Sequence, residues 1–216
     1  MKREYNMNPD EWKLIFNAPL TSDLNEIIHS IAGTSNANIH TFDADKGLHI
    51  KTTSVGQYGV KYTLPQSFKD AVSTTGSIRL LTSVIMYRVS GSNGTVTPWR
   101  MDNTNSDSDS MNPVLVSTIA PIAFNTSRLN LPNNTSLHLY EDMTCDFTNM
   151  SAITGVSTVW SDYDGRSFTL NLSMPSSYYK VRPQQCPYFR ILHAINGGNT
   201  GECYIKDLKI YRYVGA

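Results

Sequence analysis

Residues 188–214 read YFRILHAINGGNTGECYIKDLKIYRYV, and this stretch shows most clearly how the chain folds. Phe189, Ile191 and Ile195 lead into a glycine-rich turn, and a second apolar run from Cys203 to Val214 follows it. Side chains that alternate with a period of two line one face of a β-strand. The stretch therefore predicts two antiparallel strands that close the chain as a hairpin.

The second run changes parity in its middle. Cys203 and Ile205 have odd numbers, whereas Leu208 and Ile210 have even numbers. In an unbroken strand the two pairs would point to opposite faces, and one extra residue between them would return both pairs to a single face. We therefore predict a β-bulge at Lys206–Asp207. The alternative is a strand that is buried on both sides.

Similar apolar runs occur along the rest of the chain. Residues 78–89 (IRLLTSVIMYRV) are apolar on both faces, which is typical of a central strand, and the turn at 90–94 predicts a hairpin with 95–101. Residues 156–160 and 168–174 flank an Asp-Gly turn, which predicts another hairpin. Shorter runs predict strands at 12–16, 48–51, 58–64, 114–124 and 137–147.

Only two segments have helical signals. An apolar face at helical spacing predicts a helix from Ser22 to Ala32, formed by Leu24, Ile27, Ile28 and Ile31. Pro65 begins a shorter helical turn that is predicted from Gln66 to Ser73. We expect the first helix to cover one open edge or end of a sheet.

The composition also favours strands. Charged residues make up 17% of the 216 positions, against roughly 25% in an ordinary globular chain, and Ser, Thr and Asn supply much of the polarity. These residues favour turns and strand surfaces over helix interiors. We predict an all-β fold, an antiparallel β-sandwich (jelly roll) with one or two short helices. An N-terminal arm at residues 1–11 precedes a single domain at 12–216, and we expect the arm to be disordered or to lie on a neighbouring subunit.

Charge and cysteine usage limit the partners and the cellular compartment. The 18 basic residues equal the 18 acidic ones, so no net field attracts nucleic acid, and we expect no nucleic-acid partner. No apolar run reaches the roughly 20 residues that span a bilayer, and the N-terminus shows no export signal, so we expect no membrane partner. Cys145, Cys186 and Cys203 are an odd number at wide spacing, and we interpret them as buried thiols of a protein assembled in the cytoplasm. The alternative is a single disulfide between two of them.

The closing strands resemble those of a known family. Tyr188 to Ile191, followed by residues 201–211 (GECYIKDLKIY), is similar to the last strands of jelly-roll carbohydrate-binding modules. Modules of this kind also serve in phage virions as capsid decorations and tail attachment domains. The resemblance therefore implies sugar binding or a virion role.

Signatures of catalysis and metal binding are sparse. The usual nucleophile, zinc and phosphate-loop motifs are missing, and the five histidines are scattered, so we expect no enzymatic activity and no cofactor. Asp43 and Asp45 are the leading candidates for a structural calcium site, because calcium binds several oxygen ligands. The alternative is that this pair belongs to the turn before the strand at Leu48.

Aromatic residues in or beside turns are the candidates for glycan binding, because sugar recognition needs exposed rings with polar groups around them. The candidates are Trp99, Trp160, Tyr163, Tyr178 and Tyr179. In the alternative interpretation the two tryptophans cap the core and the tyrosines lie at a subunit interface.

Together these features predict a non-enzymatic phage virion protein, either a capsid decoration or a tail attachment protein. Its partners would be other virion proteins, further copies of itself in a homo-oligomer, and a glycan on the host surface. It would be assembled in the host cytoplasm and localise to the virion. The alternative is a carbohydrate-binding module of a larger glycan-active system, and a third possibility is a small hydrolase.

Overall fold

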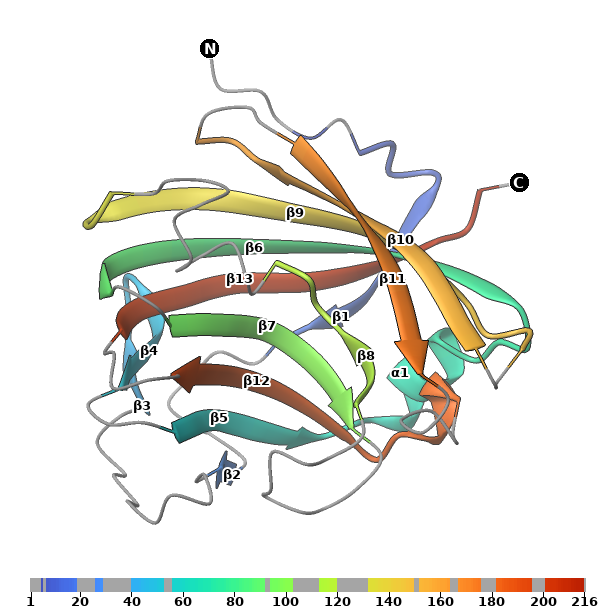
Figure 1. Ribbon diagram of the computed structural model, residues 1–216, viewed down its shortest axis with the longest axis horizontal. Coiled ribbons are helices and arrows are strands. Elements are labelled where there is room, and N and C mark those ends of the chain that lie inside the picture. The colour runs from blue at the N-terminus through green and yellow to red at the C-terminus, as the bar shows by residue number, and fades with distance from the viewer. Residues whose placement is uncertain are drawn as a thin grey trace.

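The computed structural model describes residues 5, 7–18, 26–28, 40–52, 56–91, 94–102, 113–119, 132–149, 152–163, 167–175, 182–195 and 201–215. They form two antiparallel β-sheets that enclose one apolar core (Figure 1). Within these residues there is one α-helix, α1 (Gln66–Ala71), and a short 3-10 helix, η2 (Pro183–Gln185). The predicted all-β antiparallel β-sandwich with short helices is confirmed.

Among the described residues, the larger sheet has eight strands and the smaller sheet has five. The larger sheet contains, in spatial order, β11 (Ser167–Pro175), β10 (Ala152–Ser161), β9 (Thr135–Asp146), β6 (Ser77–Gly91), β13 (Gly201–Tyr213), β4 (Gly47–Thr52) and β3 (His40–Asp43), and β1 (Trp12–Asn17) also pairs with β13. The smaller sheet contains β2 (Glu26–Ile28), β5 (Gly56–Thr63), β12 (Tyr188–Ile195), β7 (Gly94–Asp102) and β8 (Pro113–Val116).

One of the three predicted hairpins is confirmed and two are wrong. Strands β10 and β11 pair from Ala152↔Pro175 to Trp160↔Ser167, as the Asp-Gly turn predicts. Strands β6 and β7 are consecutive in the chain but lie in different sheets, and so do β12 and β13. A turn signal indicates a chain reversal without choosing the sheet of the next strand, and here β7 and β13 each belong to the sheet opposite to that of the preceding strand.

The predicted helix at residues 22–32 is also wrong where it is described. Glu26 to Ile28 form β2, in which Ile27 pairs with Val60 of β5. A short helix is marginal without tertiary packing, and the edge of β5 offers backbone partners that a local helix would forgo. The rest of the predicted helix lies outside the described residues.

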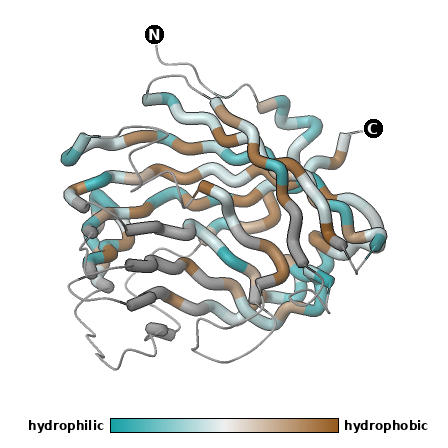
Figure 2. Tube along the Cα trace, viewed as in Figure 1, coloured by the Kyte–Doolittle hydropathy of each residue, from teal (hydrophilic) through white to brown (hydrophobic). Residues whose placement is uncertain are grey.

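The core fills the space between the sheets, and apolar and polar residues alternate along the strands that enclose it (Figure 2). Helix α1, predicted from Pro65, contributes Phe68 to this core. The three cysteines, Cys145, Cys186 and Cys203, are buried thiols without a disulfide. Within the described part of the chain, no helix has the length and apolar character needed to cross a membrane.

Candidate functional site: a groove on the outer face of the larger sheet

The predicted β-bulge is present in β13. Lys206 pairs with Ile85 and Lys209 pairs with Ser83, so β13 has one more residue than β6 between these two pairs. Asp207 takes up the extra residue with a positive φ of 51°. The four apolar residues on both sides of the bulge are fully buried in the same core: Cys203, Ile205, Leu208 and Ile210. The prediction of a bulge is therefore confirmed.

The bulge also decides which side chains face outward. Because it shifts the parity of β13, Lys209 and Tyr211 lie on the outer face of the larger sheet, opposite to the buried Leu208 and Ile210. Ser83 of the neighbouring strand β6 pairs with Lys209 on one side and with Tyr140 of β9 on the other. Side chains from three strands thus meet on one surface.

These strands form the floor of a groove of about 220 Å³. Tyr5 and Met7 of the N-terminal segment also line it. The full lining consists of Tyr5, Met7, Leu81, Ser83, Ile85, His138, Tyr140, Asp207, Lys209 and Tyr211. We call this site the outer groove. It combines aromatic rings with hydroxyl, imidazole, carboxylate and ammonium groups.

A row of hydrogen-bonded side chains crosses the floor of the outer groove. The Oγ atom of Ser83 lies 2.7 Å from Nε2 of His138, and Nδ1 of the same ring lies 3.0 Å from the Tyr140 hydroxyl. The backbone N–H of His138 donates to Oδ1 of Asp162 at 2.8 Å. The imidazole is therefore held between a serine and a tyrosine on the surface of the sheet.

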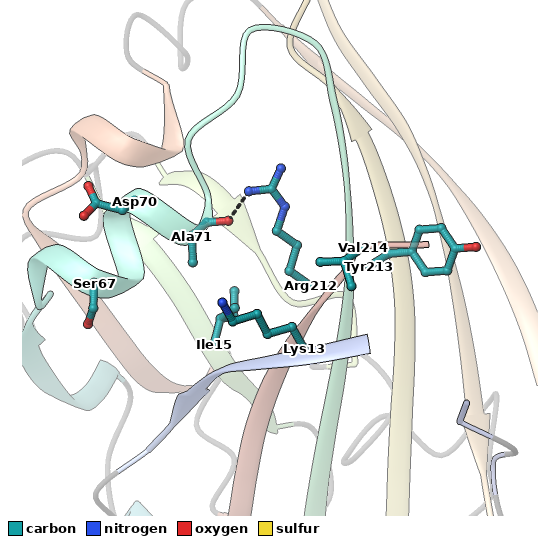
Figure 3. A pocket seen from close by; sticks show the side chains of 8 residues that line it. All are labelled: Lys13, Ile15, Ser67, Asp70, Ala71, Arg212, Tyr213 and Val214. Atoms are coloured by element: carbon teal, nitrogen blue, oxygen red, sulfur yellow. Dashed lines mark hydrogen bonds between the residues drawn. The ribbon is translucent and has the colours of Figure 1, made fainter. Parts of the chain in front are cut away.

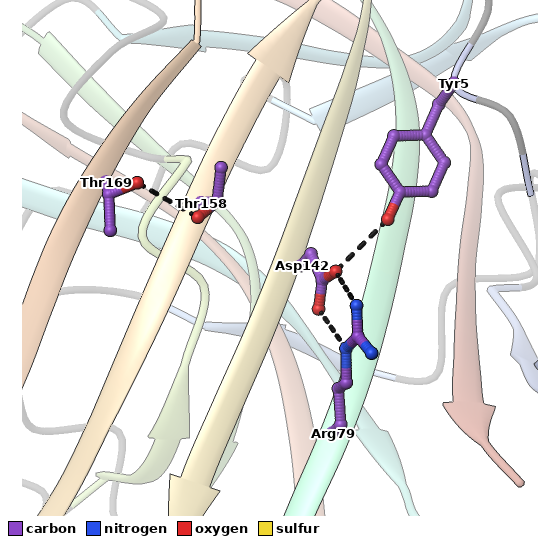
Figure 4. A network of polar contacts seen from close by, with 5 residues as sticks. All are labelled: Tyr5, Arg79, Asp142, Thr158 and Thr169. Carbon is purple, nitrogen blue, oxygen red and sulfur yellow. Dashed lines mark hydrogen bonds and ion pairs between the residues drawn. The ribbon is translucent and has the colours of Figure 1, made fainter. Parts of the chain in front are cut away.

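An aromatic cluster borders the outer groove and holds the N-terminal segment. The ring of Tyr5 stacks on Tyr140 at 5.3 Å between centroids, and Trp160 lies 5.2 Å from Tyr140. The Tyr5 hydroxyl donates to Asp142, which also accepts two hydrogen bonds from Arg79 (Figure 4). Burial, followed by the nearby Asp142, raises the pKa of Tyr5 to about 12. Tyr5 of the predicted arm thus packs on its own chain, where the sequence led us to expect disorder or a neighbouring subunit.

Tyr211 differs from the other rings at this site. The ring of Tyr140 is stacked by Tyr5 and also by His138, at 4.2 Å between centroids. Tyr211 lines the outer groove, and no ring contact involves it within the described part of the chain. Burial raises its pKa above the ordinary tyrosine value. Its ring is therefore the one best placed to receive a flat apolar ligand surface.

The five sequence-predicted aromatic residues do not form one site. Trp99 is 0% exposed and lies in the core, so its assignment as a glycan-binding residue is wrong. Trp160 belongs to the aromatic cluster beside the outer groove, and Tyr163 is 43% exposed in the turn after β10. Tyr178 and Tyr179 lie outside the described residues.

The calcium candidates form a turn. Oδ1 of Asp43 accepts the backbone N–H groups of Asp45 at 2.9 Å and Lys46 at 2.8 Å, and these bonds lower the Asp43 pKa. Gly47 completes the turn with a φ of 92°, a conformation that favours glycine. The segment therefore forms the turn that is the alternative to a calcium site, because backbone N–H groups already donate to the Asp43 carboxylate. Across the described residues, no cluster of three His, Cys, Asp or Glu side chains forms a metal site.

Comparisons with known proteins give only distant likenesses. No family model and no curated protein sequence matches the chain. Similar solved structures include an alginate lyase from Aplysia kurodai (TM-score 0.47, 10% identity, 87% of this chain and 98% of that chain). They also include arcelin-5, a lectin-like defence protein from Phaseolus vulgaris (TM-score 0.47, 8% identity, 94% and 98%), and an alginate lyase from a Chlorella virus (TM-score 0.45, 9% identity, 93% and 100%). These likenesses carry no activity over to this protein.

Sequence reasoning missed the residues that line the outer groove, because they are far apart in the chain. Tyr5, Ser83, His138 and Tyr211 come from the N-terminal segment and three strands. The parity change in residues 203–210 was the available signal, since the same bulge that buries Leu208 turns Tyr211 outward.

Proposed function

We propose that this protein binds a carbohydrate in the outer groove, with a sugar ring stacked on Tyr211. The observation that supports the proposal is a partly buried tyrosine ring without an aromatic partner among the described residues, in a groove lined by Ser83, His138, Asp207 and Lys209. A sugar presents an apolar ring face together with hydroxyl groups, so it needs an aromatic surface and nearby hydrogen-bonding groups.

The size of the outer groove limits the contact. Pockets that enclose drug-sized ligands usually have about 300–1,000 Å³, whereas the outer groove has 220 Å³. We therefore propose that one sugar residue occupies it and that the remainder of a longer glycan lies along the outer face. Lys209 would donate hydrogen bonds to the hydroxyl groups of the sugar, and Asp207 would accept hydrogen bonds from them.

Binding without turnover is our first proposal, and hydrolysis is the second. The 2.7 Å contact between Ser83 and His138 supports the second, because a serine next to a histidine is an arrangement used for nucleophilic catalysis. Treatment with a fluorophosphonate tests it. Covalent labelling that disappears in Ser83→Ala would favour hydrolysis, and an unlabelled protein would favour binding alone.

The virion role stays a prediction. No described residue and no comparison bears on capsid or tail attachment, on a homo-oligomer or on localisation. A host-attachment protein and a carbohydrate-binding module would each bind a glycan. Sugar binding is therefore common to both expectations, and it is the part that the geometry of the outer groove supports.

The test of sugar binding is a glycan array followed by titration of the best ligand. Tyr211→Ala should weaken binding about tenfold, because the change removes both the ring stacking, about 0.5–1.5 kcal/mol, and the apolar contact area of the ring. Tyr211→Phe keeps the ring and should retain most of the affinity. Tyr163→Ala, an exposed tyrosine outside the groove, is the matched control. Absence of any bound glycan, or equal affinity in Tyr211→Ala and the native protein, would overturn the proposal.

A further inference from the structure

A second pocket lies between helix α1 and the paired strands β1 and β13 (Figure 3). Its volume is about 440 Å³, which is within the range of small-molecule sites. It is lined by Lys13, Ile15, Ser67, Asp70, Ala71, Arg212, Tyr213 and Val214. We call it the α1 pocket. Arg212 follows Tyr211 directly in β13, so successive side chains of this strand serve the α1 pocket and the outer groove on opposite faces.

Two cations meet in the α1 pocket. Lys13 of β1 and Arg212 of β13 are directly paired across the two strands. Like charges that face each other on paired strands destabilise a sheet unless an anion compensates them. The pairing therefore places an unbalanced positive charge on one wall of the pocket.

The protein itself does not supply the compensating anion within the described residues. Nη1 of Arg212 donates to the backbone oxygen of Ala71 at 2.5 Å, which fixes the guanidinium but uses only one of its donors. Oδ1 of Asp70 accepts from Gln66 at 2.8 Å, and Figure 3 shows this carboxylate turned away from Arg212. In the described part of the chain, neither Lys13 nor Arg212 takes part in an ion pair.

We propose that the α1 pocket binds a phosphate group, either free or as a phosphate monoester. A phosphate carries about −1.5 to −2 charges at neutral pH and three strong acceptor oxygens, which match one guanidinium, one ammonium and the Ser67 hydroxyl. The planar guanidinium of Arg212 would bind two oxygens side by side, and Lys13 would neutralise the remaining charge.

The proposal is independent of sugar binding, and its test uses the full chain. Isothermal titration with inorganic phosphate, against sodium chloride at equal ionic strength, should give saturable binding to one site. Phenyl phosphate in a second titration separates the two sources: tighter binding than inorganic phosphate indicates a monoester site, and weaker binding indicates a site for the free ion.

Two lysine variants locate the site. Lys13→Gln should weaken phosphate binding about tenfold, as expected when one charge-assisted contact is lost. It should maintain or slightly raise the melting temperature without phosphate, because Lys13 is exposed and its charge faces that of Arg212. Lys69→Gln removes the same charge from helix α1 at a residue that does not line the pocket, and it should change binding less than about twofold. Equal weakening by both variants, or no saturable binding by the native protein, would overturn the proposal.

Discussion

Glu141 of β9 shows how a single residue joins the two halves of the sandwich. Its side chain is fully buried and accepts hydrogen bonds from Ser117 Oγ at 2.6 Å, from the Thr118 N–H at 2.6 Å and from Ser157 Oγ at 2.8 Å. Ser117 and Thr118 follow β8 of the smaller sheet, whereas Ser157 belongs to β10 of the larger one. Burial raises the pKa of Glu141, and these hydrogen bonds only partly oppose that shift.

The raised pKa of Glu141 predicts a specific dependence of stability on pH. A glutamate in the unfolded chain has a pKa of about 4.3. From that value up to its higher folded pKa, the folded protein holds more protons than the unfolded chain, so the free energy of unfolding falls as pH rises. Glu141→Gln removes this contribution. Between about pH 5 and about pH 8, the free energy of unfolding measured with urea should fall less in the variant than in the native protein.

Comparing the two proteins at each pH separates Glu141 from other carboxylates. Burial would raise the pKa of Glu202, but hydrogen bonds with His49 and Lys51 lower it, so this residue contributes stability that is lost as pH falls. That contribution is common to the native protein and to Glu141→Gln. Parallel curves of unfolding free energy against pH would contradict the assignment to Glu141.

At the scale of the element, the bulge in β13 is the feature on which the outer groove depends. Asp207 holds a φ of 51°, a left-handed conformation that aspartate tolerates and that β-branched residues avoid. Its side chain is exposed, so a substitution acts mainly through the backbone. Asp207→Val should lower the free energy of unfolding by about 1–2 kcal/mol, whereas Asp207→Gly should maintain or raise it. Urea unfolding of both variants measures this difference, and equal stability would argue against strain at the bulge.

At the scale of the whole molecule, Trp99 connects the two sheets. Its indole N–H, from β7 of the smaller sheet, donates to Thr82 Oγ1 of β6 in the larger sheet at 2.6 Å, and its ring stacks with Phe189 of β12. Strands β6 and β7 are consecutive in the chain, so this contact joins sequence neighbours that lie in different sheets. The residue assigned from the sequence to glycan binding thus stabilises the sandwich.

Trp99→Phe should therefore destabilise the whole fold. The change removes the indole N–H that donates to Thr82, and it leaves a smaller ring in a fully buried position. We therefore expect the free energy of unfolding in denaturant to fall by about 1–3 kcal/mol. Trp160→Phe, on the half-buried outer face, is the control and should lose less. A larger loss in the control would contradict the central position of Trp99.

The sequence by itself determined the strand character, the β10–β11 hairpin, helix α1 and the bulge. Each depends on contacts within a few residues of the chain: the parity of Cys203 to Ile210, the Asp-Gly turn before β11, or Pro65 before α1. Such local patterns are fixed by side-chain period and turn chemistry. These patterns predict which face of a strand is buried, but they do not identify the strand that pairs with it.

Only the tertiary structure decided sheet membership and the composition of the outer groove. The sequences after β6 and β12 predict hairpins, but the strands that follow lie in the opposite sheet, because both sheets bury an apolar face against the same core. Residues 26–28 became a strand because β5 offered an open edge. Tyr5, Ser83, His138 and Tyr211 meet because β6 pairs with both β9 and β13, and pairing between strands so distant in the chain depends on the packing of the complete sandwich.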